Sequence, residues 1–487
     1  MRNLFNCYLR LGFATVIALG LLAGMGQGGV AAELRVGAAS TSITPDQPVA
    51  LSGQMHTRIS KGVESPATAT ALALESRDGD KVLDQAIMVS CDLVAIRDGI
   101  IGPVRDRLKE QISDFDPQKL LLNATHTHTA PETREGVYEL PDEGVMRPSK
   151  YLEFLIDRVT EIAVSAWKGR KAGQAGWGLG HAVVAQNRRA VYEDGHAQMY
   201  GKTDSATFRK IEGPEDHGVE VLFFWDADGT LIATAINLAC PSQEVESRSA
   251  VNADFWHQVR EQLRAKHGKN LAVLAWTGAA GDQSPHLMIR KAAEERMRTL
   301  RGLDRLEELA RRIVGAWEDA YEGARKEMHA DLPFAHKVKS ITLSLRKVTE
   351  AEYADAKQKV ETLSNDPKNR TLVYWNQGVL DRYELQEAGK ASPYSMELHV
   401  LRLGDVAIAT NDFELFTDFG IQMKARGPAL QTFVIQLAGP GTYLPTSCAV
   451  LGGGYSAIIQ SNKVGPEGGQ ELVEQTLEVM NSLWPKR

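Results

Sequence analysis

The stretch LLNATHTHTAP, residues 121–131, ends an apolar run with two histidines two residues apart. In an extended chain such side chains lie on the same face, so His126 and His128 can point into one cavity. Imidazoles are common ligands of zinc, and imidazole also serves as acid and base near neutral pH. An ordinary polar turn would contain the same residues, so the pair by itself predicts a metal site, an acid–base pair or a turn.

A second stretch with chemically capable residues is WTGAAGDQSPH, residues 276–286. An apolar strand pattern leads into a Gly-Ala-Ala-Gly turn, which Asp282 and Ser284 follow. Pro285 favours an extended conformation at Ser284, and this can present a hydroxyl or backbone N–H groups to a substrate oxyanion. The alternative is a tight loop in which both side chains bind their own backbone.

Two later loops carry a carboxylate and two tyrosines. In TNDFELFTDFG, residues 410–420, Glu414 follows a strand pattern and is either a metal ligand or a charge at a helix N-terminus. In LAGPGTYLPTSCAVLGGGYSA, residues 437–457, Tyr443 and Tyr455 stand among glycines and either line a pocket or are structural. Open α/β sheets usually build their sites in loops at strand ends, which makes all four stretches candidates for a site.

The elements that must position these loops follow from hydrophobic periodicity. Short apolar runs rich in β-branched residues predict strands at 68–75, 82–93, 120–124, 219–225, 231–239, 271–276, 398–410 and 432–437. Periods of three to four residues predict helices at 98–113, 149–169, 254–267, 290–323, 349–364 and 468–483. The segment 290–323 is either one helix or two broken near Gly302. The alternation predicts an α/β fold with a mixed, mostly buried β-sheet flanked by helices.

The predicted domain organisation is a signal peptide followed by one domain. Two arginines, an apolar run and a small-residue ending at Ala32 predict a secretory signal peptide over residues 1–32, cleaved after Ala32. Residues 33–487 then form one domain, in which the polar, helical region 348–387 forms a peripheral cap. No later run approaches 18 consecutive apolar residues, so we expect a secreted or periplasmic protein without a transmembrane segment after cleavage.

Charge and cysteine content narrow the class of protein further. The whole chain has a net charge of −7, and loss of the two signal-peptide arginines lowers it to −9. Such an acidic chain is not expected to bind nucleic acid. The mature chain keeps Cys91, Cys240 and Cys448, which are predicted to be small buried apolar residues, with one disulfide as the alternative.

Several motifs in order resemble the neutral, non-lysosomal ceramidase family over nearly the whole mature chain. They are RVGAASTSITP, ESPATATALALE, NATHTHTAPE, QNRRAVYEDG, GAAGDQSP, NDFELFTDFG and TYLPT. Known members are secreted or membrane-associated zinc amidases that cleave the N-acyl bond of ceramide. The resemblance covers the family's catalytic domain. It implies a divergent member with Zn²⁺ as cofactor and a small-molecule or lipid substrate.

The resemblance also implies roles for single residues. The metal ligands would be His126, Glu414 and Tyr443. The catalytic residues would be His128, Ser284, Arg188 and Asp282. The substrate-binding residues would be Asn187, Gln243, Asp254 and His257. Zinc would polarise the amide carbonyl, and the neighbouring imidazole would pass a proton to the leaving amine.

One position departs from the family's pattern. The family supplies a second histidine ligand after the strand at 231–239, commonly just beyond a cysteine, where this chain reads NLACPSQEVES with Pro241. Proline cannot ligate a metal. The groups that could replace the missing imidazole are His257, His286, His56, Gln243 and Glu244. The remaining alternative is a site without metal.

The leading prediction is therefore an exported, metal-assisted hydrolase of an N-acyl bond in a sphingolipid-like substrate. One alternative is a metal-independent hydrolase of a glycoside or sugar ester on the same scaffold. It would use the acidic and aromatic residues Glu244, Glu246, Asp254 and Trp256. The other alternative is a non-catalytic binding protein.

Overall fold

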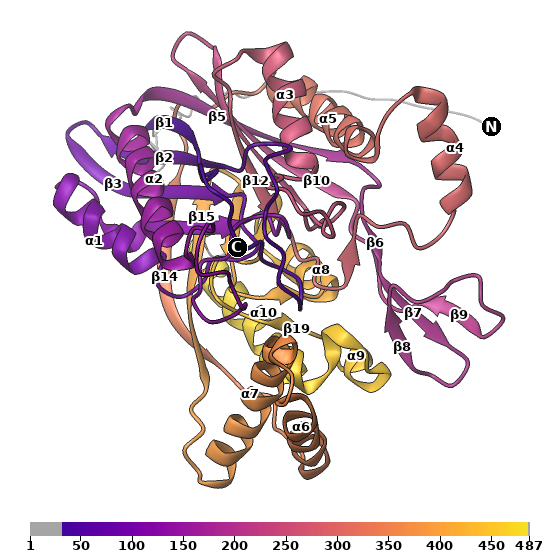
Figure 1. The fold of residues 1–487 in the computed structure, drawn as a ribbon. Helices are drawn as coiled ribbons and strands as arrows, with labels where there is room; N and C mark the ends of the chain where they lie inside the picture. Colours follow the sequence, from indigo (N-terminus) through magenta and orange to yellow (C-terminus); the bar gives the residue numbers. More distant parts are fainter. Residues whose placement is uncertain (1–31, 486–487) are drawn as a thin grey trace, which may run out of the picture. The chain divides into compact units, whose positions relative to one another are not determined.

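The structure, a computed structural model, describes residues 32–485 (Figure 1). Its strands are β1 (Glu33–Ser42), β2 (Thr68–Asp78), β3 (Lys81–Cys91), β4 (Leu120–Ala124), β5 (Lys171–His181), β6 (Gln186–Asn187), β7 (Arg189–Tyr192), β8 (Ala197–Met199), β9 (Phe208–Ile211), β10 (Gly218–Asp226), β11 (Leu231–Leu238), β12 (Ala272–Thr277), β13 (Gln283–Ser284), β14 (Phe334–Leu343), β15 (Tyr394–Leu403), β16 (Val406–Thr410), β17 (Glu414–Leu415), β18 (Gln431–Ile435) and β19 (Tyr443–Leu444). Its α-helices are α1 (Ile101–Gln111), α2 (Pro148–Lys168), α3 (Phe255–His267), α4 (Lys291–Arg301), α5 (Arg305–Ala324), α6 (Glu350–Leu363), α7 (Arg370–Glu387), α8 (Thr417–Arg426), α9 (Ser447–Gly452) and α10 (Pro466–Asn481). Apart from Ala32, the predicted signal peptide lies outside the described residues, so it stays a prediction.

The strands form two main sheets. The larger sheet has eight strands in the order β12-β11-β10-β5-β1-β2-β3-β4, and the smaller has four in the order β14-β15-β16-β18. Most neighbours are antiparallel, but β4 runs parallel to β3, β12 to β11, and β18 to β16. The mixed, mostly buried sheet flanked by helices confirms the predicted fold class.

The strand β2 shows why the larger sheet is covered on both faces. Its residues Ala71 and Ala73 belong to an apolar cluster shared with α2, whereas Leu72 and Leu74 belong to one shared with the smaller sheet. All four side chains are fully buried. Since successive side chains of a strand point to opposite faces, a strand that is apolar on both needs a packed layer on each side.

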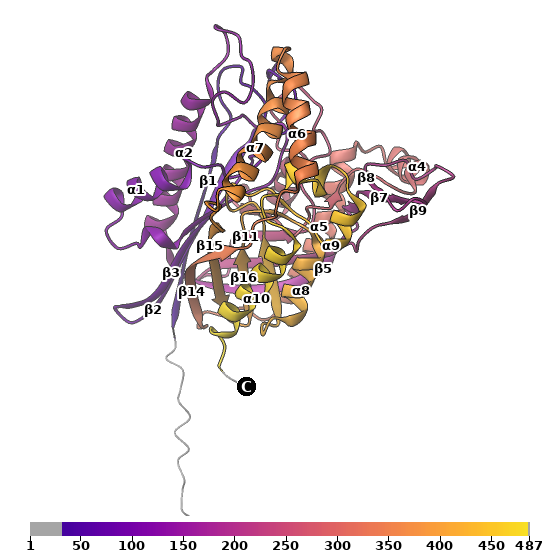
Figure 2. The same ribbon diagram turned by 90° about the horizontal axis from the view of Figure 1, so that it is seen from below.

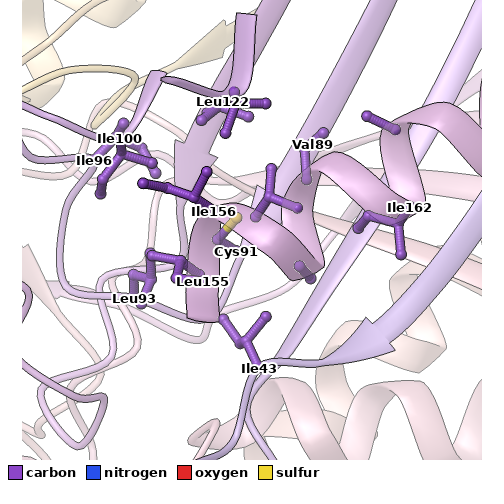
Figure 3. Packing of buried hydrophobic residues seen from close by; sticks show 14 of the residues in the cluster. Ile43, Val89, Cys91, Leu93, Ile96, Ile100, Leu122, Leu155, Ile156 and Ile162 are labelled. Atoms are coloured by element: carbon purple, nitrogen blue, oxygen red, sulfur yellow. The ribbon is translucent and has the colours of Figure 1, made fainter. Parts of the chain in front are cut away.

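Helices and sheets accordingly stack in four layers (Figures 1 and 2). The helices α1 and α2 cover β1–β4, and Leu155 and Ile156 of α2 pack with Val89 and Leu122 of the strands (Figure 3). The helices α3 and α5 cover β10–β12, and α8 and α10 cover the smaller sheet. The inner faces of the two sheets pack on each other through a shared apolar cluster.

The strand β5, with the sequence KAGQAGWGLGH, was not predicted because it has no regular apolar alternation. It nevertheless lies inside the larger sheet between β10 and β1. A Cβ atom at Gly178 would lie 2.6 Å from the carbonyl oxygen of Ala320, and one at Gly180 would lie 2.0 Å from that of Ala316. The glycines therefore let α5 approach the strand closely. This requirement comes from tertiary packing, so it produces no apolar periodicity in the sequence of β5.

Other elements differ in extent from their prediction. The predicted strand at 398–410 is wrong as a single strand, because the chain turns at Gly404 (φ +60°) into the antiparallel pair β15 and β16. The segment 290–323 contains two helices, and Gly302 in the left-handed region ends the first of them. The region 348–387 contains α6 and α7, which lie side by side (Figure 2). Its description as a cap stays a prediction.

The three described cysteines are all free. Cys91 and Cys240 are buried in apolar clusters, as predicted, whereas Cys448 is exposed. Within residues 32–485, no helix has the length and apolar character needed to cross a membrane.

Candidate active site

The loops that follow strands of both sheets are hydrogen-bonded to one another. The N–H of Ala124, the last residue of β4, donates to the carbonyl of Leu437 at 3.2 Å. The N–H of Gln436 donates to Thr277, the last residue of β12, at 2.9 Å, and the N–H of Leu437 donates to Phe413 at 3.2 Å. These bonds join the loops after β4, β12, β16 and β18, which carry the four stretches singled out in the sequence.

His126 is the second residue after β4, with its backbone in the left-handed region at a φ of 66°. This conformation costs a non-glycine residue free energy, and such strain is concentrated at functional sites. Its Nδ1 lies 2.6 Å from the carbonyl oxygen of Val94, so Nδ1 carries the proton and donates. Its Nε2 lies 3.2 Å from Glu414 Oε2 and 3.2 Å from His128 Nε2. The structure thus brings both histidines and Glu414 together.

Glu414 and Tyr443 face each other in the short parallel pair β17–β19. Burial raises the pKa of the Glu414 carboxyl, but nearby His126 and hydrogen bonds from His126 and Tyr443 outweigh burial, so the pKa lies below its ordinary value. Burial raises the pKa of the Tyr443 hydroxyl well above its ordinary value, and the Glu414 carboxylate adds to this effect. A carboxylate and a neutral phenol therefore lie together beside His126.

Arg188 is a buried cation that connects several loops of the site. Only 1% of the residue is exposed. Its guanidinium donates to the carbonyl of Gly281 at 2.9 Å, to the hydroxyls of Tyr200 and Tyr443 at 3.1 and 3.2 Å, and to Gln243 Oε1 at 2.9 Å. Because arginine has no acceptor, each of these groups must turn a lone pair toward it.

Gln243 connects Arg188 to His128. Its Oε1 accepts from Arg188, so its Nε2, which lies 2.8 Å from His128 Nε2, faces the imidazole as a donor. His128 Nε2 is then an acceptor. Burial, followed by the neighbouring charges of His126 and Arg188, lowers the pKa of His128 well below its ordinary value. His128 is therefore a neutral imidazole at neutral pH.

Ser284 is fully buried beside Tyr200. Its Oγ lies 3.0 Å from the Tyr200 hydroxyl and accepts the backbone N–H of His286 at 3.2 Å. Among the side chains that the structure describes, no imidazole hydrogen-bonds to this hydroxyl. The arrangement suits a donor to a substrate oxygen better than an activated serine nucleophile, which needs a base in contact.

Asp282 and Asn187 lie behind the residues that face the site. The Asp282 carboxylate accepts from Asn187 Nδ2 at 2.8 Å, and from the N–H and hydroxyl of Thr417, the first residue of α8, at 2.9 and 2.7 Å. Burial raises the pKa of Asp282 to about 6, although these hydrogen bonds act in the opposite direction. The carboxylate therefore ties Asn187 to the start of α8. The predicted catalytic role of Asp282 and substrate-binding role of Asn187 stay predictions.

Asp254 precedes α3 with a strained backbone at a φ of 54°. One of its oxygens accepts the N–H of Val245 at 2.9 Å and the other accepts the N–H of Phe255 at 2.8 Å. Burial raises the pKa of Asp254 to about 7. Both oxygens are thus used to fasten the loop that carries Gln243 to the start of α3, and the predicted contact of Asp254 with substrate stays a prediction.

Of the three histidines considered as replacement ligands, His286 lies beside the site, with its Nε2 3.3 Å from Glu246 Oε1. His257 is half-buried on α3, and the charges that act on it come from other α3 side chains and from Asp92. His56 is exposed. The structure therefore does not group His257 or His56 with His126.

Sequence reasoning missed two residues that shape the site. Tyr200 contacts both Arg188 and Ser284, but no motif identifies it. Gly53 has a φ of +97°, and a Cβ atom there would lie 2.5 Å from Cγ of His128. Only the close approach of two distant loops reveals this requirement for glycine, so the sequence contains no signal for it.

The donors around His126 fit a cation. When His126 is neutral, with its proton on the Nδ1 that donates to Val94, its Nε2 presents a lone pair, which faces the Glu414 carboxylate and the acceptor nitrogen of His128. An arrangement in which acceptor atoms face one another is unfavourable by itself, and a positive charge placed among them makes it favourable. His126, Glu414 and Tyr443 thus lie together, and their role as metal ligands stays a prediction, while Pro241 contributes no ligand. Within residues 32–485, no group of three or more His, Cys, Asp or Glu side chains could hold a metal ion, so the predicted set relies on the Tyr443 phenol as its third ligand.

An aromatic row leads from the helical region toward the site. The ring of Trp375 on α7 packs on Tyr455 with 5.7 Å between ring centroids, and Tyr455 meets Tyr443 at 5.8 Å. The hydroxyl of Thr371, also on α7, donates to the carbonyl of Val137 at 3.1 Å. The helix therefore borders the site and contacts the long loop between β4 and α2.

The arrangement of layers and strand-end loops places the chain among α/β proteins with a ceramidase-like fold. It is similar to the neutral ceramidase from Pseudomonas aeruginosa, with 16% sequence identity, a TM-score of 0.68, and coverage of 93% of this chain and 75% of that one. It is also similar to a ceramidase complexed with C2, with 14% identity, a TM-score of 0.65 and the same coverage. No family model matches the sequence, and the comparison with curated proteins finds no match. The resemblance noted in the sequence is thus confirmed at the level of the fold.

Proposed function

We propose that this chain is a hydrolase that cleaves an N-acyl (amide) bond in a sphingolipid-like substrate, with assistance from a metal ion. The observation that carries the proposal is the meeting of His126 Nε2 with His128 Nε2 and Glu414 Oε2, each at 3.2 Å. The similarity of the fold to solved ceramidases supports the same reaction class. The site contains groups for holding a cation, for moving a proton and for binding a carbonyl oxygen.

The buried donors of the site would bind the acyl carbonyl group. The guanidinium of Arg188 and the hydroxyls of Tyr200 and Ser284 form one connected group. Donors that are fixed in a buried site stabilise an oxygen that gains negative charge, because they need no rearrangement during the reaction.

His128 would move the proton. Its Nε2 would take a proton from water as the water oxygen bonds to the acyl carbon, and would give it to the departing nitrogen as the C–N bond breaks. The products are a carboxylic acid and an amine. The N–H of Gln243, which donates to this nitrogen at 2.8 Å, would have to make way for the water.

The residues that would hold a zinc ion are His126, Glu414 and Tyr443. The ion would supply Lewis-acid polarisation of the acyl carbonyl and would lower the pKa of a water molecule. Binding of the zinc ion would depend on the backbone carbonyl of Val94. The hydrogen bond from Nδ1 of His126 to this carbonyl fixes the tautomer in which Nε2 is free to bind the ion.

The test is hydrolysis of a fluorescent N-acyl sphingosine by protein purified without chelator, alongside measurement of its metal content. We expect His128→Ala to lower kcat/KM by about 100- to 10,000-fold, the usual contribution of a general acid–base. The matched control is His196→Ala, because His196 is an exposed histidine paired with Asp194 outside the site. Absence of turnover by zinc-loaded wild-type protein would contradict the proposed activity.

A second candidate is a metal-independent hydrolase of a glycoside or sugar ester, for which Pro241 in place of a histidine ligand is the supporting observation. The contacts of the acidic residues disfavour it, because Asp254 binds backbone N–H groups and Glu244 pairs with Arg305 at 3.2 Å. Activity on a glycoside that survives EDTA would favour this candidate. A non-catalytic binding protein would show no turnover on any of these substrates.

We also propose that the chain is exported, on the basis of the signal-peptide pattern over residues 1–32. Expression of the full chain should then yield a processed protein whose N-terminal residue is Glu33. N-terminal sequencing of protein from the periplasm or medium checks this. Intact chain that remains in the cytoplasm would contradict export.

A further inference from the structure

Glu246 lies between two imidazoles at the border of the site. Its Oε2 is 3.3 Å from Nδ1 of His128, and its Oε1 is 3.3 Å from Nε2 of His286. The side chain of Glu246 is 22% exposed and that of His128 is 11% exposed. The carboxylate therefore stands where the buried site meets solvent. The resemblance to ceramidases assigns this residue no role.

The hydrogen bonds on the far side of His128 determine which ring nitrogen carries its proton. Arg188 donates to Gln243 Oε1, so the amide N–H of Gln243 donates to Nε2 of His128. A neutral imidazole that accepts at Nε2 carries its proton on Nδ1. Among the described residues this buried nitrogen has no hydrogen-bond partner in the structure, and the Glu246 carboxylate lies 3.3 Å from it.

The backbones of Glu246 and His128 are held next to each other by shared hydrogen bonds. The guanidinium of Arg58 donates to the carbonyl of Glu246 at 2.8 Å and also to the carbonyl of His128. On the other side, the N–H of Val245 is bound by the buried carboxylate of Asp254 at 2.9 Å. The main chains that carry the carboxylate and the imidazole are therefore held close to each other by hydrogen bonds.

From these contacts we propose that Glu246 is a positioning residue for His128, whose carboxylate keeps the proton on Nδ1 and turns the lone pair of Nε2 into the site. The inference rests on the proposed function, in which Nε2 takes the proton of the attacking water. A carboxylate beside the far nitrogen of a catalytic imidazole fixes its tautomer and orientation and stabilises the imidazolium that forms. The second oxygen of Glu246 lies 3.3 Å from Nε2 of His286, on the opposite side of the carboxylate.

The first test is steady-state hydrolysis of the fluorescent N-acyl sphingosine by Glu246→Gln, Glu246→Ala and Glu246→Asp in the full chain. We expect Glu246→Gln and Glu246→Ala to lower kcat by about 10- to 100-fold, the usual cost of losing a partner that orients a catalytic group, with KM changed less than about twofold. Glu246→Asp should recover most of the lost kcat, because it restores the carboxylate. An unchanged kcat, or a change confined to KM, would overturn the proposal.

The matched control is Glu64→Gln. Glu64 holds the same loop from its outer side, by accepting from Arg248 at 2.7 Å and from Asn252 at 2.8 Å. If loss of any carboxylate that anchors this loop were enough to lower kcat, Glu64→Gln would do so as well. We expect its kcat to equal that of wild type, and an equal loss in both variants would overturn the positioning role.

A second readout does not depend on turnover. In protein labelled with ¹⁵N-histidine, the signals of His128 are those lost in His128→Asn. Wild type should show a neutral ring protonated on Nδ1, and Glu246→Ala should shift these signals toward a mixture of tautomers. A wild-type proton on Nε2 would overturn the proposal. If wild type shows the Nδ1 tautomer but hydrolyses no substrate, the proposed function is contradicted. The contact between Glu246 and His128 would still be supported in that case.

Discussion

His126 and Glu414 meet across the two sheets, with 3.2 Å between Nε2 of the imidazole and Oε2 of the carboxylate. His126 follows β4 of the eight-stranded sheet, whereas Glu414 follows β16 of the four-stranded sheet. Their approach depends on the apolar cluster that joins the inner faces of the sheets. The candidate site is therefore a product of sheet packing.

Loss of the Glu414 carboxylate should weaken binding of zinc. Glu414→Gln removes the anionic ligand that faces His126, and we expect it to hold clearly less zinc per chain than wild type after purification without chelator. Elemental analysis and a competition titration with a zinc indicator measure this. Glu397→Gln, which changes a carboxylate paired with Arg105 and His399, is the control. Equal zinc content in all three proteins would contradict the ligand assignment.

Addition of a methyl group at Gly53 should disturb His128. Its Cβ would lie 2.5 Å from Cγ of His128, so Gly53→Ala must displace the ring, with a loss of about 1–3 kcal/mol in the free energy of unfolding and a lower kcat. Gly79→Ala is matched to it, because Gly79 also has a positive φ but no atom within 4 Å of the added Cβ. Urea unfolding and kcat measure the two effects. If both variants lose the same stability and the same kcat, backbone strain alone explains the losses, and the predicted contact with His128 is contradicted.

Truncation of Trp375 should affect binding of the acyl chain more than catalysis. Trp375 packs on Tyr455, which meets Tyr443, so the row offers an apolar surface beside the candidate site. We expect Trp375→Ala to raise KM several-fold for a long-chain N-acyl sphingosine, with kcat changed little. The matched substitution is Tyr374→Ala, at an exposed neighbour on α7. The same KM in all three proteins would contradict a role of α7 in substrate binding.

The stability of the fold should depend on the ionisation of Glu397. Burial raises the pKa of this carboxyl, but hydrogen bonds from His399 and Arg105 outweigh it and lower the pKa to about 2. Because the unfolded value is about 4.3, the carboxylate stabilises the fold above that pH, and its contribution is lost as the pH falls toward 2. The difference in unfolding free energy between wild type and Glu397→Gln should therefore shrink between pH 6 and pH 3 in urea titrations. A constant difference would contradict the assigned interaction.

Parts of the fold with a regular local pattern could be predicted from the sequence. The strands β2 and β4 and the helix α2 have apolar periods that match their structure, because each buries faces whose spacing follows from its own backbone geometry. The break at Gly302 was one of the two alternatives for residues 290–323, because glycine is unfavourable inside a helix and readily adopts the left-handed backbone that ends one. The histidine pair could be recognised as a candidate because two imidazoles directly follow an apolar strand.

The sequence by itself thus determined the fold class, the main strands and the loops that carry the chemically capable residues. The tertiary structure alone decided which of these residues meet. It groups His126 with Glu414 from the other sheet, leaves His257 on α3, and places Glu246 between His128 and His286. The physical reason is that local periodicity reports which face of an element is buried, whereas contacts between loops depend on how two sheets pack across a shared core.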